Sequence, residues 1–182
     1  MARPKSEEKR QLLLDAAARV IAERGDGAPT ALIAKVAGVA EGTLFTYFRT
    51  KEELLNELYG TLLAELYASA RGVPSRGKRE KLHHAWTRTL AWGLANPKKR
   101  AALRVLDVSG YVPERRRLDA ADRGNRFLAE AIGVRDEPPG FPMAVLGAVA
   151  EATLKLMIQQ PRLAEAYSAA GFEACWKIVS QR

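Results

Sequence analysis

The sequence has a single cysteine, Cys175, and only two histidines, His83 and His84, among its 182 residues. One cysteine cannot form an internal disulfide, and it excludes a metal site built from several cysteines. The two histidines are adjacent, and the other usual metal ligands are missing nearby. We therefore expect no metal site in this protein.

Long apolar runs are also missing. No stretch reaches the roughly 20 apolar residues that cross a bilayer as a helix. The N-terminal stretch MARPKSEEKR is charged and has no apolar signal core. These features predict a cytoplasmic protein without a membrane partner.

Motifs of common enzyme chemistry are absent as well. The sequence has no glycine-rich phosphate loop, no nucleophile elbow and no spaced set of histidine and cysteine ligands. We therefore expect a protein that is not an enzyme and that carries no cofactor.

The residues that are abundant favour helices. Ala, Leu, Glu, Arg and Lys dominate the sequence, and all five have high helix propensity. Hydrophobic residues make up 47% of the chain, which is enough for a substantial core. A chain of this length fits one compact domain, or a small domain fused to a larger one. The composition predicts an all-α protein.

Positive charge is in excess, with a formal net charge of +8 and a sequence pI near 9.8. A basic protein of this kind suits a nucleic-acid partner. Residues 1–57 contain nine basic and nine acidic side chains, whereas residues 71–126 contain fifteen basic and five acidic ones. The excess in residues 71–126 could attract DNA at long range, accommodate an anionic effector, or form a solvated surface.

The chain begins with a basic arm followed by an amphipathic helix. Arg3 and Lys5 could reach DNA phosphates or the minor groove, although a solvated terminus explains them equally well. Apolar residues recur between Leu12 and Ile21 with helical spacing, and Gly25 ends the pattern. We expect one helix over residues 6–25.

Residues 29–48, PTALIAKVAGVAEGTLFTYF, read as two short helices joined by a tight turn. Gly38 can adopt the left-handed conformation that stops the first helix, and the second starts near Glu41. Leu44, Phe45 and Phe48 are expected to form the apolar face of the second helix. Small and hydrogen-bonding groups lie on its free face, so this helix could enter the major groove of DNA. The alternative is an ordinary helical hairpin.

The run from Ile33 to Leu55, IAKVAGVAEGTLFTYFRTKEELL, resembles the signature of the TetR family of transcriptional repressors. The matching pieces are Ile33-Ala34, Ala37-Gly38-Val39, Gly42-Thr43-Leu44-Phe45, Tyr47-Phe48 and Lys51-Glu52-Glu53-Leu54. The resemblance covers the N-terminal third of the chain. It implies a three-helix DNA-binding domain over residues 1–50, and a helical effector-binding and dimerisation domain over residues 51–182, whose first helix spans 51–71.

The resemblance also implies roles for individual residues. Lys51 matches a phosphate contact at a helix N-terminus, where an anion is favoured. Tyr47 and Thr43 match positions that contact the DNA backbone or base edges, and the hydroxyl of Thr30 could meet a phosphate. The groups expected to face the groove are those of Ala40, Glu41, Gly42 and Thr46.

Several positions depart from the family pattern. Ala40 stands where a capping serine is frequent, which removes a cap worth about 1 kcal/mol. Ala28-Pro29 replaces a frequent Ser/Thr pair, and Phe45 replaces a commoner tyrosine. Each departure puts one DNA contact in doubt, but none threatens the fold.

Helical patterns continue at about 79–94, 98–108, 143–160 and from Pro161 to the C-terminus, with a basic helix ending near Ile132. Segment 143–160 is apolar around much of its circumference, so we expect it to be well buried. We predict that the last two helices form a homodimer interface. Its proposed residues are small groups and aromatics: Gly147, Ala148, Ala152, Tyr167, Phe172, Trp176 and Val179.

An effector pocket is the least defined prediction. Apolar and aromatic residues of the C-terminal region could line it, or could simply form core: Trp86, Leu90, Trp92, Leu103, Leu106, Tyr111, Phe127 and Met157. We expect a repressor that binds a palindromic operator as a homodimer and is released by an unidentified small molecule. An architectural DNA-binding protein without an effector is the alternative, and a helical enzyme that happens to contain a hairpin is another.

Overall fold

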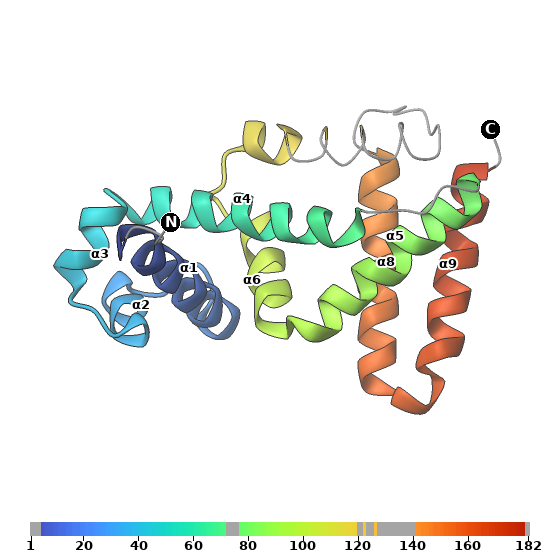
Figure 1. Cartoon of the computed structure of the whole chain (residues 1–182), viewed down its shortest axis with the longest axis horizontal. Coiled ribbons are helices and arrows are strands. Elements are labelled where there is room, and N and C mark those ends of the chain that lie inside the picture. Colours follow the sequence, from blue (N-terminus) through green and yellow to red (C-terminus); the bar gives the residue numbers. More distant parts are fainter. Residues whose placement is uncertain (1–4, 72–76, 120–121, 123–125, 127–140, 181–182) are drawn as a thin grey trace. The chain divides into compact units, whose positions relative to one another are not determined.

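The structure is a computed structural model, and it describes residues 5–71, 77–119, 122, 126 and 141–180 (Figure 1). Within these residues every regular element is a helix. The helices are α1 (Lys5–Arg24), α2 (Thr30–Ala37), α3 (Glu41–Tyr47), α4 (Lys51–Ala70), α5 (Lys78–Ala95), α6 (Pro97–Asp107), α8 (Phe141–Gln159) and α9 (Ala164–Ser180), with a 3₁₀ turn at Pro161–Leu163. Residues 114–119 are also helical. The predicted all-α class is confirmed, and most helix bounds agree within a few residues. The predicted helix ending near Ile132 lies mostly outside the described residues.

The chain divides into two compact units. Unit 1 comprises Met1–Ala64 and Asn96–Glu114, and unit 2 comprises Glu65–Ala95 and Arg115–Arg182. The chain therefore passes from unit 1 to unit 2 within α4, returns before α6 and leaves again after Glu114. The predicted domain boundary after residue 50 remains a prediction.

The core of unit 1 forms around α1. Leu13, Ala17 and Ile21 recur every four residues and are fully buried, as a core-facing helical stripe requires. Helix α1 packs against both α2 and α6. Ala102 and Leu106 of α6 are also fully buried, so a helix from the middle of the chain belongs to the same core as the N-terminal helices.

The turn between α2 and α3 has the conformation that the sequence predicts. Gly38 has φ 71° and ψ 29°, which is the left-handed region that glycine enters at little steric cost. The N–H of Gly38 donates to Lys35 and the N–H of Val39 donates to Ala34, so the turn satisfies carbonyls at the end of α2. Ala40 precedes α3 without a side-chain cap, as expected from the missing serine.

The core of unit 2 is built from α5, α8 and α9. Trp86, Leu154 and Phe172, one from each helix, are at most 5% exposed and belong to one cluster with the fully buried Cys175. The indole N–H of Trp86 donates to the carbonyl of Ser168 at 3.0 Å, which satisfies its only polar group. These contacts fix the three helices against one another.

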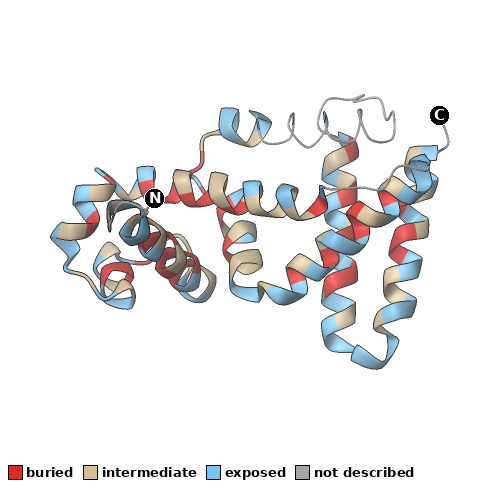
Figure 2. Cartoon of the chain, viewed as in Figure 1, coloured by how far each residue is buried: buried red, intermediate tan, exposed pale blue. Residues whose placement is uncertain are grey.

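Helix α8 differs from its prediction in two ways. Several of its residues are exposed, including Gly147, Ala148 and Ala152, so the expectation that the helix is well buried is wrong for the single chain (Figure 2). Its 18-residue window has a mean hydropathy of 1.6 and is 28% buried. By length and composition α8 could therefore cross a membrane, contrary to the sequence expectation, although core helices of other proteins pass the same test. The physical cause is an apolar surface wider than α5 and α9 can cover.

Candidate nucleic-acid interface

Helix α3 has one buried face and one exposed face. Leu44 and Phe48 are fully buried, whereas Glu41, Gly42 and Thr46 are exposed. Thr43 and Tyr47 are half-buried at the sides. The helix is thereby held on a core while small and hydrogen-bonding groups face outwards, which is the arrangement that reading a DNA groove requires.

Phe45 is 41% exposed, so its predicted place on the buried face of α3 is wrong. Its neighbour Leu44 lies one turn before Phe48 and shares the buried face with it, whereas Phe45 is displaced by about 100° around the helix. An exposed phenyl ring on this helix can make apolar contact with a thymine methyl group. The sequence pattern of i, i+1, i+4 could not tell which of two adjacent apolar residues is buried.

Thr30 and Glu41 are hydrogen-bonded to each other. The hydroxyl of Thr30 at the start of α2 donates to Oε1 of Glu41 at the start of α3, over 2.6 Å. The two residues were predicted as separate DNA contacts, and the structure brings them together. A phosphate contact by Thr30 requires its hydroxyl to leave Glu41, whereas the carboxylate could accept a hydrogen bond from a cytosine amino group.

Thr46 makes a hydrogen bond within its own helix. Its hydroxyl donates to the carbonyl of Gly42 over 3.1 Å. This bond engages the only donor of the side chain and leaves the oxygen lone pairs and the methyl group exposed. In this conformation Thr46 can accept a hydrogen bond from a base or contact a thymine methyl group.

The start of α4 is capped by the preceding threonine. The N–H of Glu53 donates to the hydroxyl of Thr50 at 3.0 Å, and the carboxylate of Glu53 accepts from the N–H of Arg49 at 2.8 Å. Lys51 in the first turn of α4 is half-buried, and its ammonium lies 5.0 Å from the centre of the Tyr111 ring. The N-terminus of α4 and the charge of Lys51 both favour an anion at this position.

Arg10 of α1 is a contact that our sequence reasoning missed. Its guanidinium pairs with the carboxylate of Glu57 on α4, donates to the carbonyl of Tyr47 over 3.2 Å, and lies 4.6 Å from the centre of the Phe48 ring. The hydrogen bond that Arg10 donates to the Glu57 carboxylate raises the pKa of Arg10. One side chain thus connects α1, the end of α3 and α4. The sequence did contain a signal for this contact. Arg10 lies three residues before the buried Leu13, which places it on the core-facing side of α1.

The remaining predicted DNA contacts are partly described. Ala40 is exposed directly before α3. Arg3 and the side chain of Lys5 lie outside the described residues, so their roles remain predictions.

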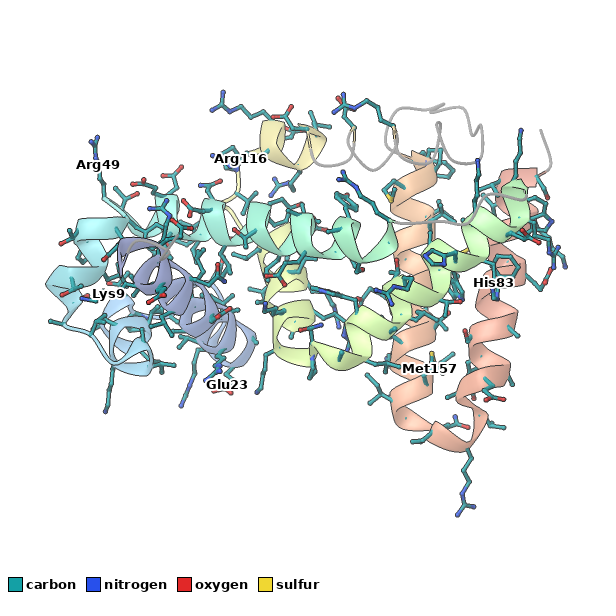
Figure 3. All side chains as sticks on the ribbon, in the orientation of Figure 1. Lys9, Glu23, Arg49, His83, Arg116 and Met157 are labelled. Atoms are coloured by element: carbon teal, nitrogen blue, oxygen red, sulfur yellow. The ribbon has the colours of Figure 1, made fainter. Side chains whose placement is uncertain are left out.

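Some of the basic excess is paired within each unit. In unit 1, Lys98 donates to Glu23 over 2.7 Å, and Lys99 lies 3.8 Å from Asp15. Glu23 lies at the end of α1 and is labelled in Figure 3. The hydrogen bond from Lys98 lowers the pKa of Glu23. In unit 2, Arg79 pairs with Glu173. These basic side chains therefore have structural partners. For the positive charge of residues 71–126 as a whole, long-range attraction of DNA, an anionic effector and a solvated surface all remain possible explanations.

The predicted pocket residues do not gather in one unit. Trp86, Leu90, Trp92 and Met157 belong to unit 2, and Trp86 and Leu90 are buried in its core. Leu103, Leu106 and Tyr111 belong to unit 1, where Leu106 is fully buried. Phe127 lies outside the described residues. A pocket lined by these residues therefore remains a prediction.

The predicted dimer residues divide by exposure. Gly147, Ala148 and Ala152 are exposed on α8. Phe172 is 5% exposed in the core of its own chain, Trp176 and Val179 pack partly against that core, and Tyr167 is half-buried. The small residues of α8 thus offer a free surface, whereas Phe172 serves the fold of unit 2.

Comparisons with known proteins give a consistent result. The sequence profile described as "Bacterial regulatory proteins, tetR family" matches residues 13–58. The uncharacterized HTH-type transcriptional regulator YhgD of Bacillus subtilis is 39% identical over 81 residues, which is 43% of this chain and 42% of that protein. The HTH-type transcriptional repressor KstR2 of Rhodococcus jostii is 37% identical over 70 residues, or 38% of this chain and 34% of that protein. These matches span less than half of either relative.

A solved structure extends the similarity beyond the N-terminal region. A TetR-family transcription regulator from Shewanella sp. PV-4 superposes with a TM-score of 0.82 at 28% identity, covering 93% of this chain and 97% of that one. The similarity therefore includes both the helix-turn-helix formed by α2 and α3 and the helical region that follows it.

Proposed function

Because the chain is a DNA-binding regulator of the TetR family, we propose that it is a homodimeric repressor that binds a palindromic operator and is released by a small molecule. The observation that carries the proposal is the two-sided α3. Its buried face, Leu44 and Phe48, anchors it in unit 1, while Glu41, Gly42 and Thr46 are exposed for base contacts. The similarity to KstR2, which is a transcriptional repressor, supports repression rather than activation.

The DNA interface that we propose combines base and phosphate contacts. Thr46 and Glu41 would read base edges, with Ala40 and Gly42 allowing a close approach, while Lys51, Thr30, Thr43 and Tyr47 would meet the backbone. Arg3 and Lys5 would extend the contacts as a basic arm. Phe45 adds an exposed apolar ring to the groove-facing surface.

DNA selection from a random-sequence library, followed by footprinting, tests this proposal. We expect a discrete palindromic site whose half-sites lie about one helical turn, roughly 34 Å, apart or somewhat farther. Thr46→Ala should change the preferred bases, because it removes the exposed methyl and hydroxyl without removing a charge. Continuous protection along the DNA would instead support the architectural alternative, and no protection would refute DNA binding through α3.

The proposed dimer is supported by the uncovered surface of unit 2. Gly147, Ala148 and Ala152 on α8 are exposed beside apolar Leu156, and α9 exposes Ile178. Small residues allow a partner helix to approach closely, and pairing would remove this apolar surface from water. One recognition helix contacts few base pairs, and a two-fold dimer doubles the site.

Sedimentation of Ala148→Glu tests the interface. Ala148 is exposed, so the substitution should leave the fold of the chain intact while placing a charge in the dimer contact. We expect a wild-type dimer at micromolar concentration and a monomeric variant. Ala91→Glu is the matched control, since Ala91 is an exposed alanine on α5. A monomeric wild type, or a variant that dimerises like the control, would contradict this interface.

The effector would bind in the region after residue 50 and act on the spacing of the two DNA-binding heads. A ligand that fits only the conformation with separated heads shifts the population towards it. Full switching, from 1:99 to 99:1, needs about 5.5 kcal/mol of differential binding. Helix α4 is the proposed connection, since it begins at the DNA-binding Lys51 and continues to Ala70 in unit 2. Native mass spectrometry of the purified protein would identify a co-bound small molecule.

We propose that the protein acts in the cytoplasm, where its operator DNA is found.

A further inference from the structure

The turn that follows α6 is hydrogen-bonded to α4 and to the turn between α1 and α2. The hydroxyl of Ser109 donates to Asp26, between α1 and α2, over 2.6 Å. The side-chain amide of Asn56 on α4 donates to the carbonyl of Tyr111 over 3.0 Å, and the N–H of Tyr111 donates to the Ser109 hydroxyl over 3.1 Å. The next residue, Val112, is 1% exposed. The backbone of Tyr111 is therefore held on both sides.

The Tyr111 ring contacts the lysine at the start of α4. The ammonium of Lys51 lies 5.0 Å from the ring centre, which is within the range of a cation–π contact. Among the described residues, no carboxylate lies within 4.0 Å of this ammonium. A ring takes one side of an ammonium and leaves N–H donors for another partner. The contact thus restrains Lys51 without neutralising its charge.

We infer that Tyr111 is a positioning residue of the DNA interface, holding the Lys51 ammonium ready for a phosphate. The inference rests on the proposed function, in which Lys51 contacts the DNA backbone. A free lysine loses rotamer entropy when it binds a phosphate, and a side chain already restrained by a fixed ring loses less. The DNA interface then includes Tyr111, which lies more than fifty positions beyond the helix-turn-helix. This residue belongs to the region for which the sequence predicted effector binding.

Equilibrium binding of the full-length protein to a mixed-sequence 40-base-pair duplex tests the inference, because a phosphate contact does not depend on base sequence. Lys51→Ala should weaken binding and reduce the slope of log affinity against log salt by about one unit. Tyr111→Leu should weaken binding roughly two- to five-fold, whereas Tyr111→Phe, which keeps the ring, should bind like wild type. In the Lys51→Ala background, Tyr111→Leu should cause no further loss. Thermal unfolding of each variant checks that the fold is retained.

The outcomes separate the inference from the proposed function. If Lys51→Ala weakens binding but Tyr111→Leu binds as well as wild type or more tightly, the positioning role is refuted while the phosphate contact stands. An equal loss from Tyr111→Leu with and without Lys51 would also refute it, because the effect would not pass through Lys51. Wild-type affinity and salt slope in Lys51→Ala would refute the phosphate contact itself, and the positioning role with it.

Discussion

Cys175 shows what burial does to one ionisable group. The side chain is fully buried in unit 2, and burial raises the pKa of its thiol from an ordinary 9.0 to about 11. The thiolate is the reactive form, so this cysteine should be inert towards alkylation at neutral pH while the chain is folded. The same shift makes stability depend on pH.

Above pH 9 an unfolded chain releases the thiol proton, whereas the folded chain keeps it until about pH 11. The unfolded state is therefore favoured as pH rises, and the stabilisation lost between these values is about 3 kcal/mol. Urea unfolding of wild type and Cys175→Ala between pH 8 and 11 measures it. The stability of wild type relative to the variant should fall as pH rises, and a constant difference would contradict the shifted pKa.

At the scale of elements, close packing of helices depends on Gly171 in α9. A Cβ atom at this position would lie 2.4 Å from Oγ1 of Thr153 on α8 and 2.6 Å from a ring carbon of Trp86 on α5. Both neighbours are buried, so neither can move freely.

Gly171→Ala should consequently destabilise unit 2 by roughly 1–3 kcal/mol, in spite of the better helix propensity of alanine. Gly60→Ala is the matched control, because nothing lies within 4 Å of a Cβ at that position of α4. The control should be neutral or gain up to about 1 kcal/mol. Denaturant unfolding followed by circular dichroism compares the two, and equal effects would show that the α9 contact tolerates a methyl group.

Arg10 connects the end of α3 to α1 and α4. Arg10→Lys keeps the charge but loses the paired geometry on Glu57 and the planar contact with Phe48. We expect roughly 1–2 kcal/mol of destabilisation and weaker DNA binding. Arg19→Lys, an exposed position on the same helix, should change neither. Unchanged stability and DNA affinity in Arg10→Lys would mean that the packing of Leu44 and Phe48 alone positions α3.

The elements themselves were largely predictable from sequence, because glycine at position 38, the capping Thr50 and the apolar spacing of α1 act locally. Contacts between distant residues were not. The choice between Leu44 and Phe45 for the core, the pairing of Thr30 with Glu41 and the role of Arg10 all depend on which helices pack together. The exposed apolar face of α8 could not be foreseen either, because hydrophobic periodicity does not say whether the covering surface belongs to the same chain.

At the scale of the whole molecule, the N-terminal helices do not make a complete unit by themselves. Helix α6 contributes the fully buried Ala102 and Leu106 and packs against α1. A fragment ending at Ala70 should therefore expose apolar surface on α1 and unfold at a lower temperature than the full chain.

Thermal unfolding of this fragment, beside Leu106→Ala in the full chain, tests that expectation. The point variant should lose about 2–5 kcal/mol, since it leaves a cavity in the same core. A fragment that unfolds cooperatively at the temperature of the full chain would show that α6 adds nothing to unit 1.

The return of the chain to unit 1 after α5 has a consequence for its synthesis. A nascent polypeptide emerges from the N-terminus, so α1 to α3 leave the ribosome well before residues 96–114, which complete their core. At about 5–20 residues per second, the fifty residues after Ala64 take roughly 3 to 10 seconds to be added. During that interval the helix-turn-helix lacks α6, and Lys51 lacks the ring of Tyr111. The core around α1 and the contact between Lys51 and Tyr111 are therefore complete only after α6 and the turn that follows it have been translated.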